Sequence, residues 1–574
     1  MNARLQPLRS CVVAALLAPA LLSTAGCALR DHGVRDAARE YYGTALPFAS
    51  EAVYFVVTDR FVNGDHGNDQ RDQAAGPWQT FDRPLPGPDG DSDNIGYLGG
   101  DLRGVLDNAD YVRDLGFSAV WITPIVDNPD AAFSGGDAPS WGSMWTDRGK
   151  TGYHGYWGVN FYRADEHLVS RDLDFAAFTR GMRARGLKVV LDIVANHGSP
   201  AFGMEPRLPG FGQVFAADGS LLADHQNLAP AQLDPQRVPL HRFYKRESEL
   251  AQLSNFDDAS PEVLDYLTGA YLQWIAQGAD AFRIDTVSLM PPAFWQRFAD
   301  RIRAKHPGFF LFGEAFSYDA AAVAQYTWPG GGEMSVLDFP LKQAIAALFQ
   351  NPGGDYASVL PALHLQDGLY SNPYELMTFY DNHDMARLDA SDAGFIDAHN
   401  FLFTARGIPV IYYGSETGFM RGRGEHAGNR NYFGQARVDA AKHSVIHANL
   451  RRIAQVRARS AALQRGLQVN LEFSGDRAVF YRVFQRGDAA QTALVLLNKG
   501  DMPQSFRVER WLQPGRWRSA LDPRVQTIAA ETALVTEVPA HGVEVWLLDA
   551  PVTQPELRAE LDRLRLALLH TNGG

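Results

Sequence analysis

Acidic, basic and imidazole side chains recur at the ends of four short apolar segments in this chain of 574 residues. The segments run into Asp192–His197, Phe282–Asp285, Gly313–Glu314 and Asp381–Asp384. One such carboxylate alone would most simply cap a helix or a turn. Four groups together, without a matching set of metal ligands, favour a reaction that uses two carboxylates. One attacks an anomeric carbon, and the other protonates the leaving oxygen of a glycosidic bond.

The spacing of Arg283 and Asp285 supports this interpretation. Residues two apart lie on the same side of a β-strand, so we expect the guanidinium beside the carboxylate. Its fixed positive charge would keep Asp285 ionised and ready as a nucleophile. Glu314 would need a raised pKa to act as the acid, and burial beside a second carboxylate such as Asp384 would supply it.

These groups need a scaffold that brings several strand ends together. Apolar, β-rich segments alternate with amphipathic helical patterns, and a continuous apolar run such as VVLDIV (189–194) is typical of a parallel sheet covered on both faces. The pattern predicts strands at Val53–Arg60, Ala119–Pro124, Lys188–Val194, Ala281–Asp285, Phe309–Phe316, Met334–Phe339, Met377–Tyr380 and Pro409–Tyr413. It predicts helices at Leu173–Arg185, Pro261–Gln277, Ala293–Lys305 and Ser444–Arg459.

The alternation indicates an α/β protein built on a (β/α)8 TIM barrel, whose active site is lined by residues just beyond the C-terminal strand ends. A doubly wound open sheet is the alternative, but no predicted strand is followed by a phosphate-binding glycine fingerprint. Residues 198–258, after the third strand, are rich in Gly and Pro and lack a helical period, which predicts a small inserted subdomain.

The C-terminal part of the chain has a different pattern. Short alternating strands at Val479–Phe484, Ala493–Asn498, Ser505–Val508 and Val543–Leu548 predict an antiparallel β-sandwich. A final helix carries Leu557, Leu561, Leu564 and Leu568 on one stripe, which we expect to dock on the protein itself. The predicted division is a lipoprotein-type signal peptide (1–26), a linker (27–50), the barrel (51–460), the sandwich (461–550) and the C-terminal helix (551–574).

Four motifs carry a family resemblance. DIVANH (192–197), ADAFRID (279–285), FGEAF (312–316) and FYDNHD (379–384) resemble the four conserved regions of the α-amylase family of glycoside hydrolases. GFSAVWITPI (116–125), VLDFPL (336–341) and GIPVIYYGSE (407–416) are similar to further runs of that family, in the same order. The resemblance implies a retaining (β/α)8 enzyme that acts on α-glucosidic bonds, and it implies that the sandwich corresponds to the family's C-terminal domain.

The same resemblance implies roles for individual residues. Asp285 would be the nucleophile, Glu314 the general acid/base, and Asp384 the carboxylate that stabilises the transition state and distorts the sugar. The residues implied to bind that sugar are Arg283, His197, His383, His154 and Tyr156, the last as a stacking platform within YHGYW (153–157).

Further motifs are similar to those of cyclodextrin glucanotransferases and maltogenic amylases, namely TDRF (58–61), GGDLRG (99–104) and YHGYW. The chain departs from them at Ser288-Leu289, where Lys-His is usual, so acceptor binding must differ. It also has Ser248 where a cyclising enzyme carries its central aromatic residue, and the starch-binding domains that follow the sandwich in those enzymes are absent. These departures favour hydrolysis over cyclisation.

A polar loop predicts a Ca²⁺ site. Four oxygen-bearing side chains fall within seven residues, and calcium prefers six to eight oxygen ligands. These are Asn63, Asp65, Asn68 and Asp69, and the resemblance implies that Gly99 and Asp101 complete the site. A second family site would use Asn196, but Gln252 stands where an Asp is expected.

Three functions remain open at this point. The first is an α-amylase-type hydrolase of α-1,4 bonds in starch or maltodextrins. The second is a cyclomaltodextrinase, neopullulanase or maltogenic amylase, although the extra N-terminal domain common in those enzymes has no counterpart between Cys27 and the first predicted strand. The third is a catalytically inactive glucan-binding relative, which the three retained carboxylates disfavour.

Charge and cysteine usage indicate partners and location. The net charge is −13, with 53 Lys and Arg against 66 Asp and Glu and no basic stripe, which argues against nucleic acid and favours a neutral substrate. The two cysteines are Cys11 and Cys27, and Leu22-Ser-Thr-Ala-Gly-Cys27 after an apolar run resembles a bacterial lipobox. We expect a monomer attached to the membrane only through a lipid on Cys27, as an outer-membrane lipoprotein facing the periplasm or exterior, or else a secreted protein.

Overall fold

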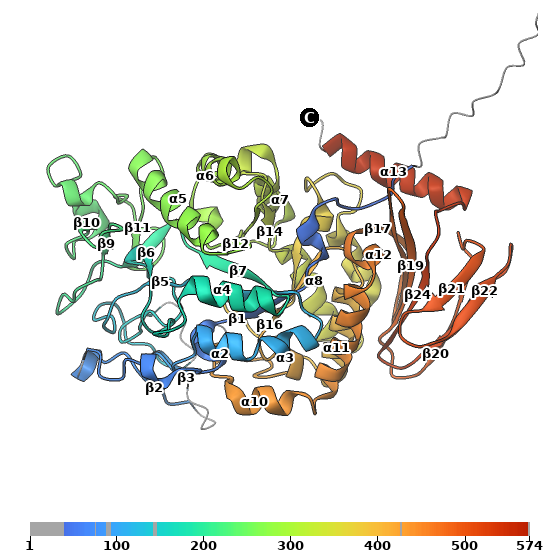
Figure 1. Ribbon diagram of the computed structural model, residues 1–574, viewed down its shortest axis with the longest axis horizontal. Helices are drawn as coiled ribbons and strands as arrows, with labels where there is room; N and C mark the ends of the chain where they lie inside the picture. Colours follow the sequence, from blue (N-terminus) through green and yellow to red (C-terminus); the bar gives the residue numbers. More distant parts are fainter. Residues whose placement is uncertain (1–38, 75, 88–92, 142–145, 425–427, 572–574) are drawn as a thin grey trace, which may run out of the picture. The chain divides into compact units, whose positions relative to one another are not determined.

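The computed structural model describes residues 39–571, apart from 75, 88–92, 142–145 and 425–427 (Figure 1). The expected signal segment at 1–26 lies outside the described residues, as do residues 27–38 of the expected linker. Within the described part, the longest and most apolar helices still fall short of what crossing a bilayer requires.

Within the described residues, eight parallel strands form the central sheet, in the order β14-β13-β12-β7-β4-β1-β16-β15. Their bounds are β1 Val53–Val56, β4 Ala119–Ile122, β7 Lys188–Ile193, β12 Ala281–Ile284, β13 Phe310–Gly313, β14 Ser335–Val336, β15 Met377–Thr378 and β16 Ile408–Tyr412. A parallel bridge between Leu337 and Met377 joins the two edge strands and closes the barrel. The predicted (β/α)8 barrel is therefore confirmed.

The first strand is shorter than predicted. It ends at Val56, and helix α1 (Thr58–Phe61) begins two residues later. The reason is that two buried charged side chains of α1 bind the loop at residues 94–99. The Asp59 carboxylate accepts hydrogen bonds from the backbone of Leu98 and Gly99. The Arg60 guanidinium donates to the carbonyl oxygens of the same loop.

The helices that surround the sheet begin where side chains cap them. Asp174, Ser260, Asp338 and Ser444 each accept a backbone N–H in the first turn of α4, α5, α8 and α11. The bounds are α2 Leu102–Asp107, α3 Ala109–Asp114, α4 Phe175–Ala184, α5 Pro261–Ala276, α6 Pro292–Lys305, α7 Ala320–Ala324, α8 Phe339–Phe349, α9 Asp392–Leu402, α10 Gly434–Ala441, α11 Val445–Ala458 and α12 Ala461–Arg465. The four predicted helices correspond to α4, α5, α6 and α11, with ends that differ by at most two residues.

The segment after β7 folds into short antiparallel pairs. Strand β8 (His197–Pro200) pairs with β11 (Leu253–Asn255), and β9 (Gln213–Phe215) pairs with β10 (Leu221–Asp224). Two further small pairs lie earlier in the chain, β2 (Pro84–Leu85) with β3 (Asp93–Asn94) and β5 (Val126–Asp127) with β6 (Asn160–Ala164).

In the described C-terminal part, six antiparallel strands form one sheet in the order β17-β18-β19-β24-β21-β22, and β20 pairs with β23. The bounds are β17 Leu467–Ser474, β18 Arg477–Arg486, β19 Ala489–Asn498, β20 Gln504–Val508, β21 Gly515–Ser519, β22 Val525–Ile528, β23 Leu534–Val538 and β24 Gly542–Leu548. Trp517 and Trp546 of the sheet share one apolar cluster with Phe506 and Leu534 of the pair, as expected for a sandwich.

Helix α13 (Pro555–Thr571) packs against this domain (Figure 1). Leu557, Leu561 and Leu564 are buried, so the leucine stripe docks on the protein itself, as expected. The start of the described chain meets the same domain: Tyr41 forms an antiparallel bridge with Gln485, and its hydroxyl donates to Asp562 of α13 at 3.2 Å.

Candidate active site

The four motif segments meet at the C-terminal ends of the barrel strands. Asp192 lies in β7, Asp285 directly follows β12, Glu314 directly follows β13, and Asp384 lies in the loop after β15. Arg283 of β12 is in register with Asp192 of the neighbouring strand. The parallel register therefore explains why these charges are adjacent although the sequence separates them.

Arg283 is the centre of this group. Its Nη1 lies 2.9 Å from Asp192 Oδ1 and 2.8 Å from Asp285 Oδ1, and its Nη2 lies 2.8 Å from Glu314 Oε2. The side chain has no exposed surface. Burial would lower the pKa of Arg283, but Asp192 and Glu314 outweigh that effect and raise it, so the guanidinium stays charged. One cation thus positions both carboxylates that the sequence assigns to bond cleavage.

Asp192 forms hydrogen bonds that position Arg283 from the neighbouring strand. Its Oδ2 accepts hydrogen bonds from Trp121 Nε1 at 3.0 Å and from the Tyr156 hydroxyl at 2.7 Å, in addition to the contact with Arg283. Asp192 belongs to the motif DIVANH (192–197), which by itself assigns this carboxylate no role. Its hydrogen bonds assign it to holding Arg283 and Tyr156 in place.

Glu314 has the environment of an acid. Burial raises its pKa well above the ordinary value, and the negative charges of Asp384 and Asp285 raise it further, while Arg283 opposes the shift. Its Oε2 accepts a long hydrogen bond of 3.3 Å from the backbone of Thr286. Its Oε1 is buried and has no hydrogen-bond partner among the described residues, so this oxygen is available to a ligand.

Asp384 is held by Arg430, a residue that the sequence analysis missed. Arg430 Nη2 lies 2.6 Å from Asp384 Oδ1, and Arg430 Nε donates to the His383 carbonyl oxygen at 3.0 Å. Arg430 follows β16 within Gly428-Asn429-Arg430, which forms no motif with the carboxylates in sequence. A buried cation opposite a motif carboxylate could have been anticipated only from the loop's folded position.

Three imidazoles and a tyrosine lie beside these carboxylates. The Tyr156 hydroxyl lies 2.7 Å from His383 Nε2, and the Tyr156 and His154 rings stack with centroids 5.7 Å apart. Burial lowers the pKa of His383 well below its ordinary value, and Arg430 and Arg283 lower it further, so this imidazole is neutral. Burial also lowers the pKa of His197. Apart from Arg283, every residue that the resemblance implies to bind sugar lines the same cavity as Asp285 and Asp384.

These side chains line one cavity of about 660 Å³. On one side of the carboxylates the lining includes Tyr153, Tyr156 and Arg430. On the other side it includes residues that follow β12, β13 and β14, namely Ser288, Leu289, Phe316, Tyr318 and Lys342. A cavity of this size is typical of a small-molecule binding site.

The expected calcium loop is assembled in part. Asp101 Oδ1 accepts from the backbone of Gly64 at 3.1 Å, and its Oδ2 accepts from the backbone of Asp65 at 2.9 Å. A Cβ on Gly99, whose φ is +88°, would lie 2.2 Å from Asn63 Nδ2 and 2.4 Å from Asp69 Oδ1. The lack of a side chain at Gly99 therefore lets the two loops approach each other.

The donor set of this loop fits a hard cation. Asn63 Oδ1 and Asn68 Oδ1 are buried and have no hydrogen-bond partner among the described residues. Asp69 and Asp101 add buried carboxylates beside them. The Asp65 carboxylate accepts a hydrogen bond from the Gly67 backbone at 2.9 Å.

Two other groups concern metal binding. Asn196 is fully buried, and neither amide atom has a hydrogen-bond partner among the described residues, so no hydrogen bond joins it to Gln252.

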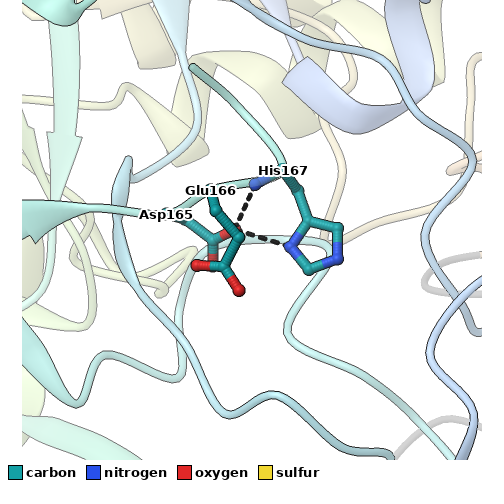
Figure 2. A group of neighbouring side chains, drawn as sticks. All are labelled: Asp165, Glu166 and His167. Carbon is teal, nitrogen blue, oxygen red and sulfur yellow. Dashed lines mark hydrogen bonds and ion pairs between the residues drawn. The ribbon is translucent and has the colours of Figure 1, made fainter. Parts of the chain in front are cut away.

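Figure 2 shows Asp165, Glu166 and His167, which bring ligand-type atoms within 4.8 Å of one another. The Asp165 carboxylate is already bonded to the His167 ring and backbone, at 2.8 and 2.9 Å, which explains this cluster as a braced turn.

Comparisons with known proteins agree with this geometry. The alpha-amylase catalytic-domain family model matches residues 55–207 and 240–462, more than half of the chain. A cyclomaltodextrin glucanotransferase of Klebsiella oxytoca is 28% identical over 522 residues, which cover 80% of this chain and 72% of the relative. An alpha-amylase of Streptomyces lividans is 28% identical over 549 residues, but the chain spans 58% of that relative.

Solved structures give the same result. A cyclomaltodextrin glucanotransferase with a three-domain ABC distribution has a TM-score of 0.70 and 28% identity, covering 87% of this chain and 99% of that one. An alpha-amylase from Geobacillus thermoleovorans, complexed with acarbose, has a TM-score of 0.66 and 25% identity, covering 88% and 99%. The fold, the cluster of carboxylates and the matched ranges together show that this chain belongs to the alpha-amylase family of glycoside hydrolases.

Proposed function

We propose that this protein is a retaining hydrolase that cleaves α-1,4-glucosidic bonds in starch, maltodextrins and related α-glucans. The observation that carries the proposal is the pairing of Asp285 and Glu314 through one buried guanidinium, with Asp384 across the same cavity. The pair supplies a carboxyl group beside a guanidinium and a second carboxyl with a raised pKa, which suit double displacement at an anomeric carbon.

In the first step an Asp285 oxygen forms a bond to the anomeric carbon while the bond from that carbon to the leaving oxygen breaks. The Glu314 proton moves to the leaving oxygen, so the departing saccharide leaves as a neutral alcohol. Glu314 is then a carboxylate next to Arg283, and that cation stabilises the new charge.

In the second step Glu314 takes a proton from water. The water oxygen bonds to the anomeric carbon, and the bond to Asp285 breaks. Two displacements restore the α configuration. Asp384, held between Arg430 and His383, is placed to bind sugar hydroxyls and to stabilise the positive charge that develops on the ring.

Transfer to a second sugar, with cyclisation, is the competing function, because several similar relatives are cyclomaltodextrin glucanotransferases. The three-domain relative removes one argument against it, since an enzyme of that name exists without further domains. Ser248 still disfavours cyclisation. It is exposed, and its hydroxyl donates to the Ala251 backbone at 3.2 Å, so it offers no aromatic surface around which a glucan could wrap.

Product analysis tests the proposal. The enzyme should convert amylose into linear maltooligosaccharides, and proton NMR in the first minutes should show α-anomeric products. A β product would refute double displacement, and cyclodextrins as main products would favour the transferase. Preference for pullulan or β-cyclodextrin over amylose would favour a neopullulanase or cyclomaltodextrinase. Inactivity on all of these substrates would favour a non-catalytic glucan-binding protein.

We further propose that Asn63, Asp65, Asn68, Asp69, Gly99 and Asp101 bind Ca²⁺, supported by the two buried amide oxygens that have no hydrogen-bond partner among the described residues. The ion would brace the loop against the segment that Asp59 and Arg60 hold. Asn196 remains a candidate ligand for a second ion. Removal of the ion should therefore change stability rather than the chemistry of the carboxylates.

We also propose that Cys27 becomes the acylated N-terminus of a cell-envelope lipoprotein, on the evidence of the Leu22–Cys27 segment. Ala28 follows, where an Asp would favour retention in the inner membrane of a Gram-negative cell. Cys27→Ser should release the enzyme from the membrane fraction with unchanged activity. Complete partition of the wild-type protein into the aqueous phase of a detergent extraction would contradict the anchor and leave secretion as the alternative.

A further inference from the structure

We propose that Lys342 is a specificity-determining residue that binds the saccharide on the leaving-group side of the cleaved bond. The inference rests on the proposed hydrolase function and extends it to the acceptor half of the cavity. Lys342 is half-buried and lines the catalytic cavity, although it follows a different strand from each of the three catalytic carboxylates.

The position of Lys342 is set by a buried ion pair. Helix α8 begins with Asp338 as its N-cap, and the Asp338 carboxylate lies 2.6 Å from Arg406 Nη1 with both side chains fully buried. The Lys342 backbone donates to the Asp338 carbonyl oxygen at 2.9 Å. The first turn of α8 is thus fixed to the barrel, and Lys342 projects from a rigid element rather than from a mobile loop.

Two exposed aromatic rings accompany it. Phe316 is 49% exposed and Tyr318 is 41% exposed, although both belong to the wall of the cavity. Both rings pack on Phe339 of α8, with centroid distances of 4.8 and 6.2 Å. The Lys342 Nζ lies 5.9 Å from the Tyr318 ring centroid. Aromatic faces bind the apolar faces of sugar rings, and an ammonium group donates hydrogen bonds to sugar hydroxyls.

The side of the cavity follows from the chemistry. Glu314 protonates the leaving oxygen, so the leaving saccharide extends away from Tyr156 and Arg430 and past Glu314. Phe316 and Tyr318 follow Glu314 in the same loop, and Lys342 lies in α8, which follows the neighbouring strand β14. This group is therefore in the path of the leaving saccharide.

Three cations line the cavity among the described residues, namely Lys150, Arg430 and Lys342. On the leaving-group side, Ser288 and Leu289 carry no charge, and Lys342 is the lining cation there among the described residues. It is thus placed to provide the charged hydrogen-bond donor for the leaving saccharide.

The test compares two substrates with different leaving groups. Maltoheptaose places glucosyl units on the leaving-group side. The leaving group of α-maltotriosyl fluoride is a fluoride ion, which makes no such contacts. For Lys342→Met we expect KM for maltoheptaose to rise about tenfold, with kcat/KM for the fluoride within about twofold of wild type. Lys342→Arg should recover most of the loss, because it keeps a cationic donor. Lys305→Met, an exposed lysine outside the cavity lining, is the matched control.

The possible outcomes separate the two proposals. Unchanged maltoheptaose kinetics in Lys342→Met would overturn the inference. Equal losses on both substrates would also overturn it, because they indicate a structural effect on the catalytic carboxylates. A wild-type enzyme that cleaves neither substrate would instead refute the proposed hydrolase function. The melting temperature of each variant shows whether it folds.

Discussion

Replacing Arg430 with methionine tests a part of the active site that lies outside the sequence motifs. The side chain is 6% exposed, and its guanidinium joins Asp384 Oδ1 at 2.6 Å and the His383 carbonyl oxygen at 3.0 Å. Methionine retains an unbranched apolar stem but has no charge and no donor. The substitution therefore removes the cation from Asp384 while the volume of the site changes little.

The expected magnitude follows from the bonds that are lost. A hydrogen bond to a charged group contributes about 1.5–3 kcal/mol, and each 1.4 kcal/mol corresponds to about tenfold in rate. If Asp384 acts mainly in the transition state, kcat/KM for maltoheptaose should fall by about 10- to 150-fold, and most of the change should appear in kcat.

The pH dependence should change in a defined direction. The charge of Asp384 raises the pKa of Glu314, and Arg430 partly neutralises that charge. Without Arg430 the pKa of Glu314 should rise further. Activity requires protonated Glu314, so the alkaline limb of kcat/KM should move to higher pH in Arg430→Met.

Steady-state kinetics across the pH range in which both proteins are folded would measure these effects. Arg437→Met, an exposed arginine of α10, is the matched control and should behave like wild type. If Arg430→Met kept kcat/KM within about twofold of wild type, or if its alkaline limb moved to lower pH, the argument that Arg430 positions Asp384 would be refuted.

Three further predictions concern the carboxylates, the metal loop and the contact between barrel and sandwich. Asp285→Asn or Glu314→Gln should cost about 4–8 kcal/mol of transition-state stabilisation at an unchanged melting temperature, and a tenth of wild-type activity in either variant would contradict its role. A chelator should lower the melting temperature, since a ligand at 100 times its Kd stabilises the folded state by about 2.7 kcal/mol. Asp101→Ala should reduce this response. Identical melting curves with and without chelator would exclude the site. Asp397, with Asp501, raises the pKa of His541 from 6.5 to about 9, so the stabilisation by the protonated imidazole should be lost as pH rises from 6.5 through about 9. Burial raises the pKa of Asp397 to about 6, so the comparison is made above that pH. Denaturant titrations should show that His541→Ala lacks this loss, and an equal loss in both proteins would assign it to other groups.

The barrel was predictable because its strands are continuous apolar runs that end in polar motifs. The predicted strand Lys188–Val194, which contains VVLDIV, corresponds to β7 with a one-residue difference at its C-terminal end. The first strand was predicted too long because Thr58, Asp59 and Arg60 follow it without a turn signal, and only their tertiary partners show that they leave the strand.

The candidate site was predictable where spacing determines proximity. Arg283 and Asp285 are two residues apart on one strand, so their contact follows from strand geometry. Arg430 and Lys342 were not predictable, because loop and helix positions across the barrel rim bring them to the cavity.

The contact of Tyr41 with Gln485 and Asp562 has a consequence for the order of folding during synthesis. Asp562 is made 521 residues after Tyr41. At a synthesis rate of about 5–20 residues per second, Tyr41 waits roughly 25–100 s for its last partner. Every barrel strand is made within that interval, so the barrel can form before Tyr41 contacts Gln485 and Asp562. Docking of Tyr41 and of α13 should therefore be the final event of folding.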